Sequence, residues 1–227
     1  MPSKKNKTNI IIFGASINSK VIIDIIEKEE KYIIAGLIDK TYKKGIKLMD
    51  YPLIGCDKDI IKIIKDYNIN GGVIGIGDNQ TRALVYKKII KLIPDFNFIK
   101  CIHPSAEIGK NVRIGEGTVI MAGAVINSDS SIGKFCILNT KASLDHDGYM
   151  SDFSSLAPGV TLGGNVRIGN NTAVSLGANV IHKIKIGNHS VIGAGALVVK
   201  DIPDLVVAYG VPAKIIRKRK KGDIYLR

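Results

Sequence analysis

Aliphatic residues recur at every sixth position through the second half of the chain without interruption. Neither an amphipathic helix, with its period of about 3.6 residues, nor a single alternating strand gives this spacing. The members of the series are Ile102, Ile108, Ile114, Ile120, Ile126, Ile132, Leu138, Leu144, Met150, Leu156, Leu162, Ile168, Val174, Val180, Ile186, Ile192 and Val198.

A small or β-branched residue stands two positions before each next large one, as Ala106 stands before Ile108. Residues two apart on a strand face the same side, so each hexad predicts a short strand with one large and one small side chain turned inward. Gly, Asn or Asp often follows the large residue and tolerates turn geometry. With three hexads to a triangular coil, the pattern predicts a parallel β-helix of between five and six coils.

The first hundred residues alternate between apolar β-branched runs and amphipathic stretches. Strands are predicted at 10–13, 33–38 and 73–76, with a short one near Phe98, and helices around 21–26, 57–67 and 81–93. This alternation is typical of a small Rossmann-like parallel sheet with helices on its faces. We therefore expect two domains, an α/β domain over 1–100 and a β-helix with a basic tail over 101–227.

Ligands of such sheets bind at the carboxyl ends of the strands, here Gly14 to Asn18, Asp39 to Lys40 and Gly77 to Asn79. Gly14-Ala15-Ser16 lacks the second and third glycines of a dinucleotide fingerprint, so a plain strand-to-helix turn is an equal interpretation. Asp39 could bind a ribose or cap the following turn. Three such loops at one sheet edge favour a nucleotide ligand.

Charge and composition narrow the class of protein. The 227 residues carry a formal net charge of +13, but the lysines are scattered beside isoleucines, which favours a solvated basic surface over a nucleic-acid site. No apolar run reaches the roughly 20 residues that span a bilayer, and no signal-peptide core follows the basic start, Met1 to Thr8. We expect a cytoplasmic protein without a nucleic-acid partner or membrane insertion.

Two smaller features complete the composition. The three cysteines, Cys56, Cys101 and Cys136, are odd in number, and in a reducing compartment buried free thiols are expected. Five consecutive cations from Arg217 to Lys221 follow the last coil. Such a run is usually solvated or disordered, although it could also attract ligand phosphates.

His146 is the candidate catalytic residue. It falls two places after the inward Leu144 and two before the inward Gly148, so it should lie at a coil corner and point outward. A carboxylate from Asp145 or Asp147 would fix its tautomer and raise its basicity, which suits a general base. A surface histidine among solvated aspartates is the alternative.

The remaining histidines suit structural roles better. His103 stands beside a proline at the domain junction, and His182 and His189 lack adjacent carboxylates. The spacing among His146, His182 and His189 does not favour a three-histidine metal site of the kind found in some hexapeptide β-helices. No metal is therefore expected.

The order of the two regions resembles the bacterial sugar-nucleotide N-acetyltransferases of the bacillosamine and perosamine pathways, with the related sialic acid O-acetyltransferases. The segment Ile137 to Asp147 is similar to the family's stretch that ends in a catalytic histidine and an acidic residue. Supporting matches are Ile76 to Asn79 with Arg82, Gly164 to Val166, and Gly210 to Lys214.

The resemblance implies a left-handed β-helix, a homotrimer, acetyl-CoA as acetyl donor between neighbouring subunits, and a nucleotide-linked amino sugar as acceptor. His146 would be the base, Asp147 (or Asp145) would orient it, and the Gly164 N–H would polarise the thioester. The residues implied to line the cofactor site are Ser155, Gly164, Leu176, Ala194, Pro212 and Lys214. Those implied to bind substrate are Ser16, Ile17, Asn18, Asp39, Lys40, Gly77 and Asn139.

Two positions depart from the family pattern. Ile17-Asn18 stands where many relatives have a glycine-histidine pair, and Ser155 stands where they have a second histidine near the acetyl group. Two other functions stay open at this point. An O-acetyltransferase of a sialic-acid-like sugar would use the same base and donor, and a non-catalytic nucleotide-sugar-binding protein would transfer nothing.

Overall fold

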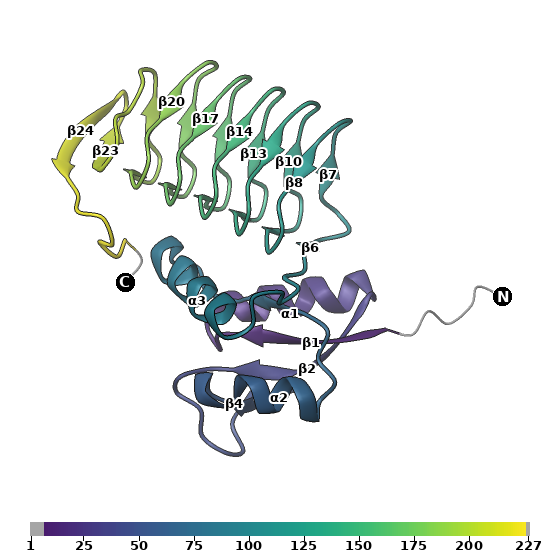
Figure 1. The fold of residues 1–227 in the computed structure, drawn as a ribbon. Helices are drawn as coiled ribbons and strands as arrows, with labels where there is room; N and C mark the ends of the chain where they lie inside the picture. Colours follow the sequence, from purple (N-terminus) through teal and green to yellow (C-terminus); the bar gives the residue numbers. More distant parts are fainter. Residues whose placement is uncertain (1–6, 226–227) are drawn as a thin grey trace.

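The computed structural model describes residues 7–225, which form a small α/β region below a prism of stacked coils (Figure 1). Of the basic start, Met1 to Thr8, positions 1–6 lie outside the described residues, and Thr8 is the first residue of β1. Among residues 7–225, no helix is both long and apolar enough to cross a membrane.

The α/β region contains one five-stranded sheet in the order β3-β4-β2-β1-β5. Neighbouring strands are parallel except for the antiparallel pair β3 and β4. The strands are β1 (Thr8–Phe13), β2 (Tyr32–Ile38), β3 (Lys47–Leu48), β4 (Tyr51–Gly55) and β5 (Gly72–Ile74), and the helices are α1 (Ile17–Glu29), η1 (Asp57–Asp59, a 3₁₀ turn), α2 (Ile60–Asp66) and α3 (Asn79–Leu92).

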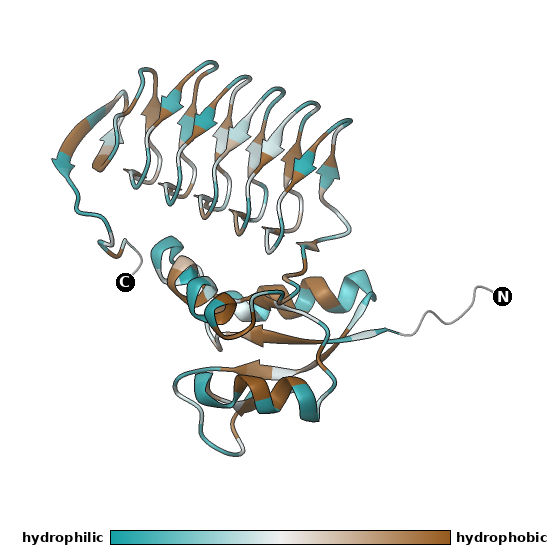
Figure 2. Cartoon of the chain, viewed as in Figure 1, coloured by the Kyte–Doolittle hydropathy of each residue, from teal (hydrophilic) through white to brown (hydrophobic). Residues whose placement is uncertain are grey.

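This sheet confirms the predicted parallel α/β arrangement. Ile10 to Phe13 in β1 are almost wholly buried, and α1 buries Ile22 and Ile26 against them, so hydrophobic residues concentrate in these elements (Figure 2). The strand predicted at 73–76 is shorter and begins one residue earlier, as β5 (Gly72–Ile74), and the short strand predicted near Phe98 is an isolated bridge between Phe98 and Gly72. The hairpin of β3 and β4 was not predicted, since its strands are only two and five residues long.

The β-helix consists of three sheets, which form the three faces of the prism and whose strands are parallel except for the last pair of the eight-stranded sheet, β23 and β24. The eight-stranded face contains β6 (Cys101–Ile102), β9 (Val119–Ile120), β12 (Ile137–Leu138), β15 (Ser155–Leu156), β18 (Ala173–Val174), β21 (Val191–Ile192), β23 (Val206–Gly210) and β24 (Ala213–Lys218). The six-stranded face contains β7 (Glu107–Ile108), β10 (Val125–Ile126), β13 (Ser143–Leu144), β16 (Thr161–Leu162), β19 (Asn179–Val180) and β22 (Leu197–Val198). The five-stranded face contains β8 (Arg113–Ile114), β11 (Ser131–Ile132), β14 (Tyr149–Met150), β17 (Arg167–Ile168) and β20 (Lys185–Ile186).

The registers confirm that three hexads make one coil. Val125 pairs with Ser143 and Ile126 with Leu144, a step of 18 residues. Beyond the first coil, where Ile108 is exposed, the large and small inward positions are mostly buried, as Leu144 and Ala142 illustrate with no exposed surface. Burial of these stacked side chains supplies the core that no single hexad could form, because each strand is only two residues long in its ladder.

The outward side chains differ between the three faces. On the eight-stranded face, Val119 and Ile137 are buried because they pack against the core of the α/β region. The five-stranded face carries cations and an aromatic residue, namely Arg113, Ser131, Tyr149, Arg167 and Lys185. The six-stranded face carries mostly short or uncharged side chains, namely Glu107, Val125, Ser143, Thr161, Asn179 and Leu197.

Arg82 of α3 forms hydrogen bonds with both regions. Its guanidinium is buried and donates to the carbonyl oxygens of Phe135 (2.8 Å) and Phe153 (3.2 Å) in the β-helix. It also donates to the carbonyl oxygen of Gly77 (2.8 Å) and to Asn79 Oδ1 (2.6 Å) in the α/β region. Because a buried cation must keep such partners, Arg82 fixes the position of the Gly77 loop over the eight-stranded face.

Four of the five cations from Arg217 to Lys221 are exposed, as expected for a solvated run, and the described part of the tail also forms regular structure. β24 pairs antiparallel with β23 and extends the eight-stranded face. Arg219 then donates from Nη1 to the carbonyl oxygen of His189 at 2.7 Å, and Lys220 N donates to Asp223 Oδ2 at 2.9 Å. The tail turns back toward the α/β region and ends there at Tyr225 (Figure 1).

Candidate active site

His146 lies in the corner between the six- and five-stranded faces, which we call the His146 corner (Asp145–Gly148). Its side chain is 58% exposed, so it points away from the packed interior as predicted. Asp147 follows with φ of 56°, a left-handed conformation that Asp tolerates better than most residues. This turn brings Asp147 Oδ2 to 2.8 Å from His146 Nδ1 and leaves Nε2 free of protein partners among the described residues.

The carboxylates of Asp145 and Asp147 accept different hydrogen bonds around His146. Asp147 Oδ2 binds the ring, whereas Asp145 Oδ1 accepts hydrogen bonds from the His146 backbone N–H (2.8 Å) and from Asn127 Nδ2 (2.7 Å). The hydrogen bond to Asp147 and the charge of Asp145 raise the pKa of His146 above its usual value. Hydrogen bonds from Asn127 and the His146 backbone lower the pKa of Asp145, which stays ionised.

Gly164 lies beside His146 in the next coil. A methyl group placed on Gly164 would come within 2.6 Å of His146 Nε2, so only glycine lets the imidazole occupy this position. The Gly164 N–H donates to no other group of the described residues. A base nitrogen and a free backbone donor therefore lie side by side, and a reacting carbonyl oxygen could accept from that donor.

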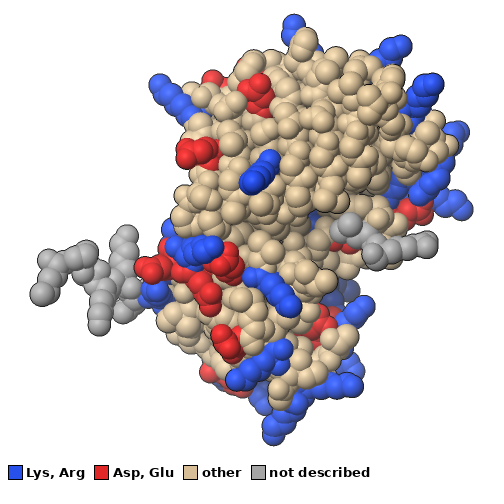
Figure 3. Space-filling view, turned by 180° about the vertical axis from the view of Figure 1, so that it is seen from behind, with Lys and Arg blue, Asp and Glu red and all other residues tan. Residues whose placement is uncertain are grey.

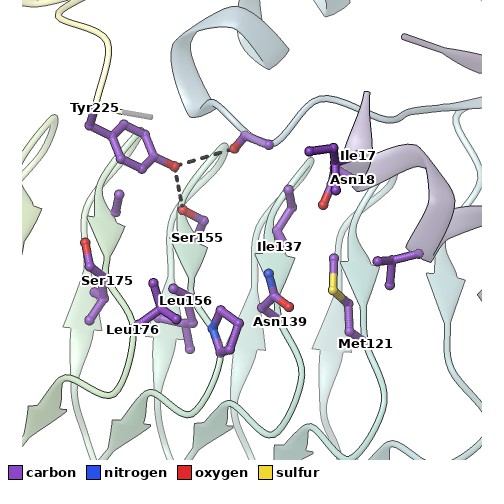
Figure 4. Close-up of a pocket in the computed structure, with 16 residues that line it drawn as sticks. Ile17, Asn18, Met121, Ile137, Asn139, Ser155, Leu156, Ser175, Leu176 and Tyr225 are labelled. Carbon is purple, nitrogen blue, oxygen red and sulfur yellow. Dashed lines mark hydrogen bonds between the residues drawn. The ribbon is translucent and has the colours of Figure 1, made fainter. Parts of the chain in front are cut away.

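A second group of predicted residues lines a cavity of about 340 Å³ between the α/β region and the β-helix (Figure 4). From the predicted site residues it gathers Ile17, Asn18, Gly77, Asn139, Ser155 and Leu176. Much of the remaining lining is apolar and includes Val21, Met121, Ile137, Leu156 and Pro158. Asn18 Nδ2 is buried without a hydrogen-bond partner among the described residues, which leaves a donor for a ligand.

Ser16 and Asp39 hydrogen-bond to the backbone of loops next to this cavity. Ser16 caps α1, where its Oγ accepts from Asn18 N at 3.2 Å and donates to the carbonyl oxygen of Gly75 at 2.7 Å. Asp39 accepts from Ala15 N and Thr41 N, both at 2.8 Å. Burial would raise the pKa of Asp39, but hydrogen bonds from the Thr41 hydroxyl, the Thr41 backbone and the Ala15 backbone outweigh it and lower the pKa. Both residues shape the loop, and neither lines the cavity.

Four other predicted residues also lie outside the cavity lining. Lys40 is exposed after β2, and Ala194 is exposed in a coil corner. Pro212 and Lys214 are exposed in the hairpin of β23 and β24. Nothing in a single chain brings these four residues to the cavity or to His146, and their roles stay predictions.

The cavity and His146 occupy different corners of the prism. Asn139 and Leu176 belong to the corner between the eight- and six-stranded faces, which we call the Asn139 corner (Asn139–Ala142 and the equivalent positions in other coils). The six-stranded face, including β13, separates this corner from the His146 corner. Neither His146 nor Gly164 lines the cavity, so a single chain does not bring the predicted base to the predicted substrate loops.

One residue of the cavity was not predicted. Tyr225 reaches the cavity from the tail, and its Oη lies 3.1 Å from Ser155 Oγ and 3.5 Å from the carbonyl oxygen of Gly77 (Figure 4). No sequence pattern marks it, because its partners lie 70 and 148 residues earlier in the chain. Its aromatic side chain after a run of cations was the only available signal.

The other titratable and thiol residues fit structural roles. His103 accepts at Nδ1 from the backbone N–H of Ser105 (3.0 Å), within the turn that was expected there. Cys101 and Cys136 are buried free thiols as predicted, whereas the free thiol of Cys56 is only half-buried. Within residues 7–225, no cluster of three or more His, Cys, Asp or Glu side chains could hold a metal ion.

Comparison with known proteins finds relatives of one kind. A family model described as the PglD N-terminal domain matches residues 9–89. PerB from Caulobacter crescentus, solved in complex with CoA and GDP-perosamine, is 34% identical with a TM-score of 0.85, and the match covers 92% of this chain and 97% of that one. The acetyltransferase domain of PglB from Neisseria gonorrhoeae FA1090, solved with acetyl coenzyme A, is 27% identical with a TM-score of 0.84, covering 93% and 100%.

A curated relative is the UDP-N-acetylbacillosamine N-acetyltransferase of Bacillus subtilis (strain 168), which is 39% identical over 117 residues. The aligned stretch spans 50% of this chain and 51% of that protein. The chain belongs to the nucleotide-sugar N-acetyltransferase family. The predicted resemblance to this acetyltransferase family is confirmed, and so is the predicted order of a parallel α/β region followed by a parallel β-helix.

Proposed function

We propose that the chain transfers the acetyl group of acetyl-CoA to the amine of a nucleotide-linked amino sugar, with His146 as general base. The observation that carries this proposal is the 2.8 Å hydrogen bond that His146 Nδ1 donates to Asp147 Oδ2, which leaves Nε2 exposed beside the free N–H of Gly164. Asp147 favours the tautomer whose unprotonated Nε2 accepts a proton.

The proposed reaction balances within these groups. The neutral sugar amine attacks the thioester carbonyl carbon, and the oxygen, which gains charge, accepts a hydrogen bond from Gly164 N–H. His146 Nε2 takes a proton from the amine as the C–N bond forms. The C–S bond then breaks, and the proton passes from His146 to the sulfur of coenzyme A, which leaves as the free thiol. An amide is the second product.

We further propose that the working unit is a homotrimer whose active sites lie between subunits. The cavity with Asn18 and Asn139 and the base at His146 flank the same six-stranded face but face different corners. When six-stranded faces pack around a threefold axis, the Asn139 corner of one copy lies next to His146 of the partner subunit. That arrangement would complete each site.

The distribution of side chains supports this choice of face. The α/β region already covers the eight-stranded face, and cations on the five-stranded face, such as Arg167 and Lys185, would repel a second copy. The six-stranded face has one charged outward residue in its strands, Glu107. Seen from behind, most of the β-helix surface likewise lacks charged side chains (Figure 3).

The acetyl-CoA would lie in the groove between two such β-helices, where the exposed Leu176 and Ala194 of the Asn139 corners are available to contact it. The nucleotide would bind over the loops that carry Asn18 and Gly77, at the carboxyl ends of β1 and β5. Lys214 and the other exposed cations of the tail would attract phosphates.

The test is release of free thiol from acetyl-CoA across a panel of UDP-, GDP- and dTDP-linked 4-amino-4,6-dideoxy sugars. We expect thiol release with at least one acceptor and an amide in the product by mass spectrometry. An ester product would identify an O-acetyltransferase instead. Nucleotide-sugar binding without thiol release from any acceptor would identify a binding protein and overturn the proposed enzyme.

A further inference from the structure

We propose that the tail residue Tyr225 is a positioning residue that turns the Ser155 hydroxyl into a hydrogen-bond donor for the ligand in the cavity. This inference rests on the proposed function, because it takes the cavity to be the acceptor half of the active site. It adds a part of the site that comes from the end of the chain, outside both the Gly77 loop and the coil that carries Ser155.

The Ser155 hydroxyl has few hydrogen-bond partners without a ligand. Its side chain is buried, with 8% of the residue exposed, and it lines the cavity. Tyr225 Oη, at 3.1 Å, is the one hydrogen-bond partner of Ser155 Oγ among the described residues. The direction of the Ser155 proton therefore depends on what Tyr225 does with its own proton.

The contacts of Tyr225 decide that direction. Its Oη has two acceptors in reach, Ser155 Oγ at 3.1 Å and the carbonyl oxygen of Gly77 at 3.5 Å. Hydrogen bonds weaken over this range, so Ser155 is the better acceptor. We take Tyr225 as the donor toward Ser155, whose own hydroxyl can then donate to a ligand.

A serine that accepts from Tyr225 keeps its own proton free, and the open space beside it is the cavity (Figure 4). Burial raises the pKa of Tyr225, so the phenol keeps its proton at neutral pH. In a chain of hydroxyl groups each bond also polarises the next, which strengthens the donor at the end. Ser155 is thus prepared to donate to a carbonyl or hydroxyl oxygen of the bound substrate.

The tail is built to hold Tyr225 at this place. Arg219 N donates to the carbonyl oxygen of Leu205 at 2.7 Å, and Arg219 Nη1 donates to the carbonyl oxygen of His189. Asp223 N then donates to the carbonyl oxygen of Lys220 at 3.1 Å, which closes a turn. These contacts fix the chain shortly before Tyr225, so its phenol needs little further ordering to reach Ser155.

The experiment is a double-mutant cycle of Tyr225→Phe and Ser155→Ala, with thiol release as the rate. Tyr225→Phe keeps the ring and removes the donor, so we expect kcat to fall about fivefold with KM changed less than about twofold. Ser155→Ala should lower kcat by about tenfold or more, and adding Tyr225→Phe to Ser155→Ala should change nothing further, because the two act as one unit. Tyr149→Phe, on the five-stranded face, is the matched control and should leave the rate unchanged.

Two outcomes overturn the proposal. Either Tyr225→Phe matches the wild-type kcat, or its effect persists in full when Ser155 is already alanine, which would show a role independent of that hydroxyl. Equal melting temperatures of the four proteins separate positioning from stability.

If the wild type releases no thiol, the proposed function fails, and the same cycle is measured as dissociation constants of coenzyme A and of the nucleotide sugars by calorimetry. A fivefold weakening by Tyr225→Phe that vanishes without Ser155 then supports the hydroxyl pair, whereas equal constants or no binding overturn it.

Discussion

The His146 corner and the Asn139 corner belong to the same coil, yet they are chemically opposite. The first carries an imidazole, two carboxylates and a backbone N–H without a partner among the described residues, on an exposed surface outside the cavity lined by Asn139. The second opens into an apolar cavity with asparagine and hydroxyl groups but has no titratable base in its lining. Under the proposed function, each corner supplies half of an acetyl-transfer site.

The difference follows from the geometry of a triangular prism. One face of the prism lies between two corners of a coil, and the cavity at the Asn139 corner is lined by no residue of the His146 corner. Two corners of different copies can converge when the face between them becomes an interface. A fold built from a strict six-residue repeat therefore favours catalysis between subunits.

Removing the base should produce the largest effect. We expect His146→Ala to lower turnover by roughly 100-fold or more, the usual scale for losing a general base. The melting temperature should change little, because the side chain is 58% exposed and packs against no core residue. Thiol-release kinetics and thermal unfolding check both parts, and a wild-type rate would eliminate His146 as the base.

Mixing two inactive variants tests whether the halves come from different copies. Ser175 lines the cavity and is partly exposed, so Ser175→Trp should block the acceptor half without touching His146. Co-expression of His146→Ala with Ser175→Trp should restore about a quarter of the wild-type rate, since random assembly gives about one site in four with two intact halves. The separately purified variants, mixed after assembly, are the control. Activity that stays at background after co-expression contradicts a site shared between subunits.

The sequence could predict the positions of side chains that the six-residue repeat alone determines. The hexads place His146 at an outward corner and Cys136 in the interior, because each position depends only on a period of six. The cavity depends on how the α/β region docks, which Arg82 decides through a partner 53 residues away. Tyr225 joins the cavity through contacts that no periodic pattern encodes.

The same reasoning separates residues with similar sequence signals. Asp39 and Ser16 follow strands as Gly77 does, yet of the three only Gly77 lines the cavity, because the side chains of the other two hydrogen-bond to backbone groups of neighbouring loops. A motif locates the loop. Which of its side chains face a ligand depends on hydrogen bonds formed after folding.

The smallest expected effect concerns the carboxylate that distinguishes the His146 corner. The hydrogen bond to Asp147 and the charge of Asp145 raise the pKa of His146, and the base works only when neutral, so wild-type kcat should rise with pH through a midpoint above the usual histidine value of about 6.5. Asp147→Asn removes the main cause, so the midpoint should move to lower pH while the plateau falls several-fold, because a less basic imidazole takes the proton less readily. Asp129→Asn is the matched control, since Asp129 has the same left-handed backbone one coil earlier and no histidine beside it. A pH profile of kcat that is identical in wild type and Asp147→Asn would show that Asp147 does not set the basicity of His146.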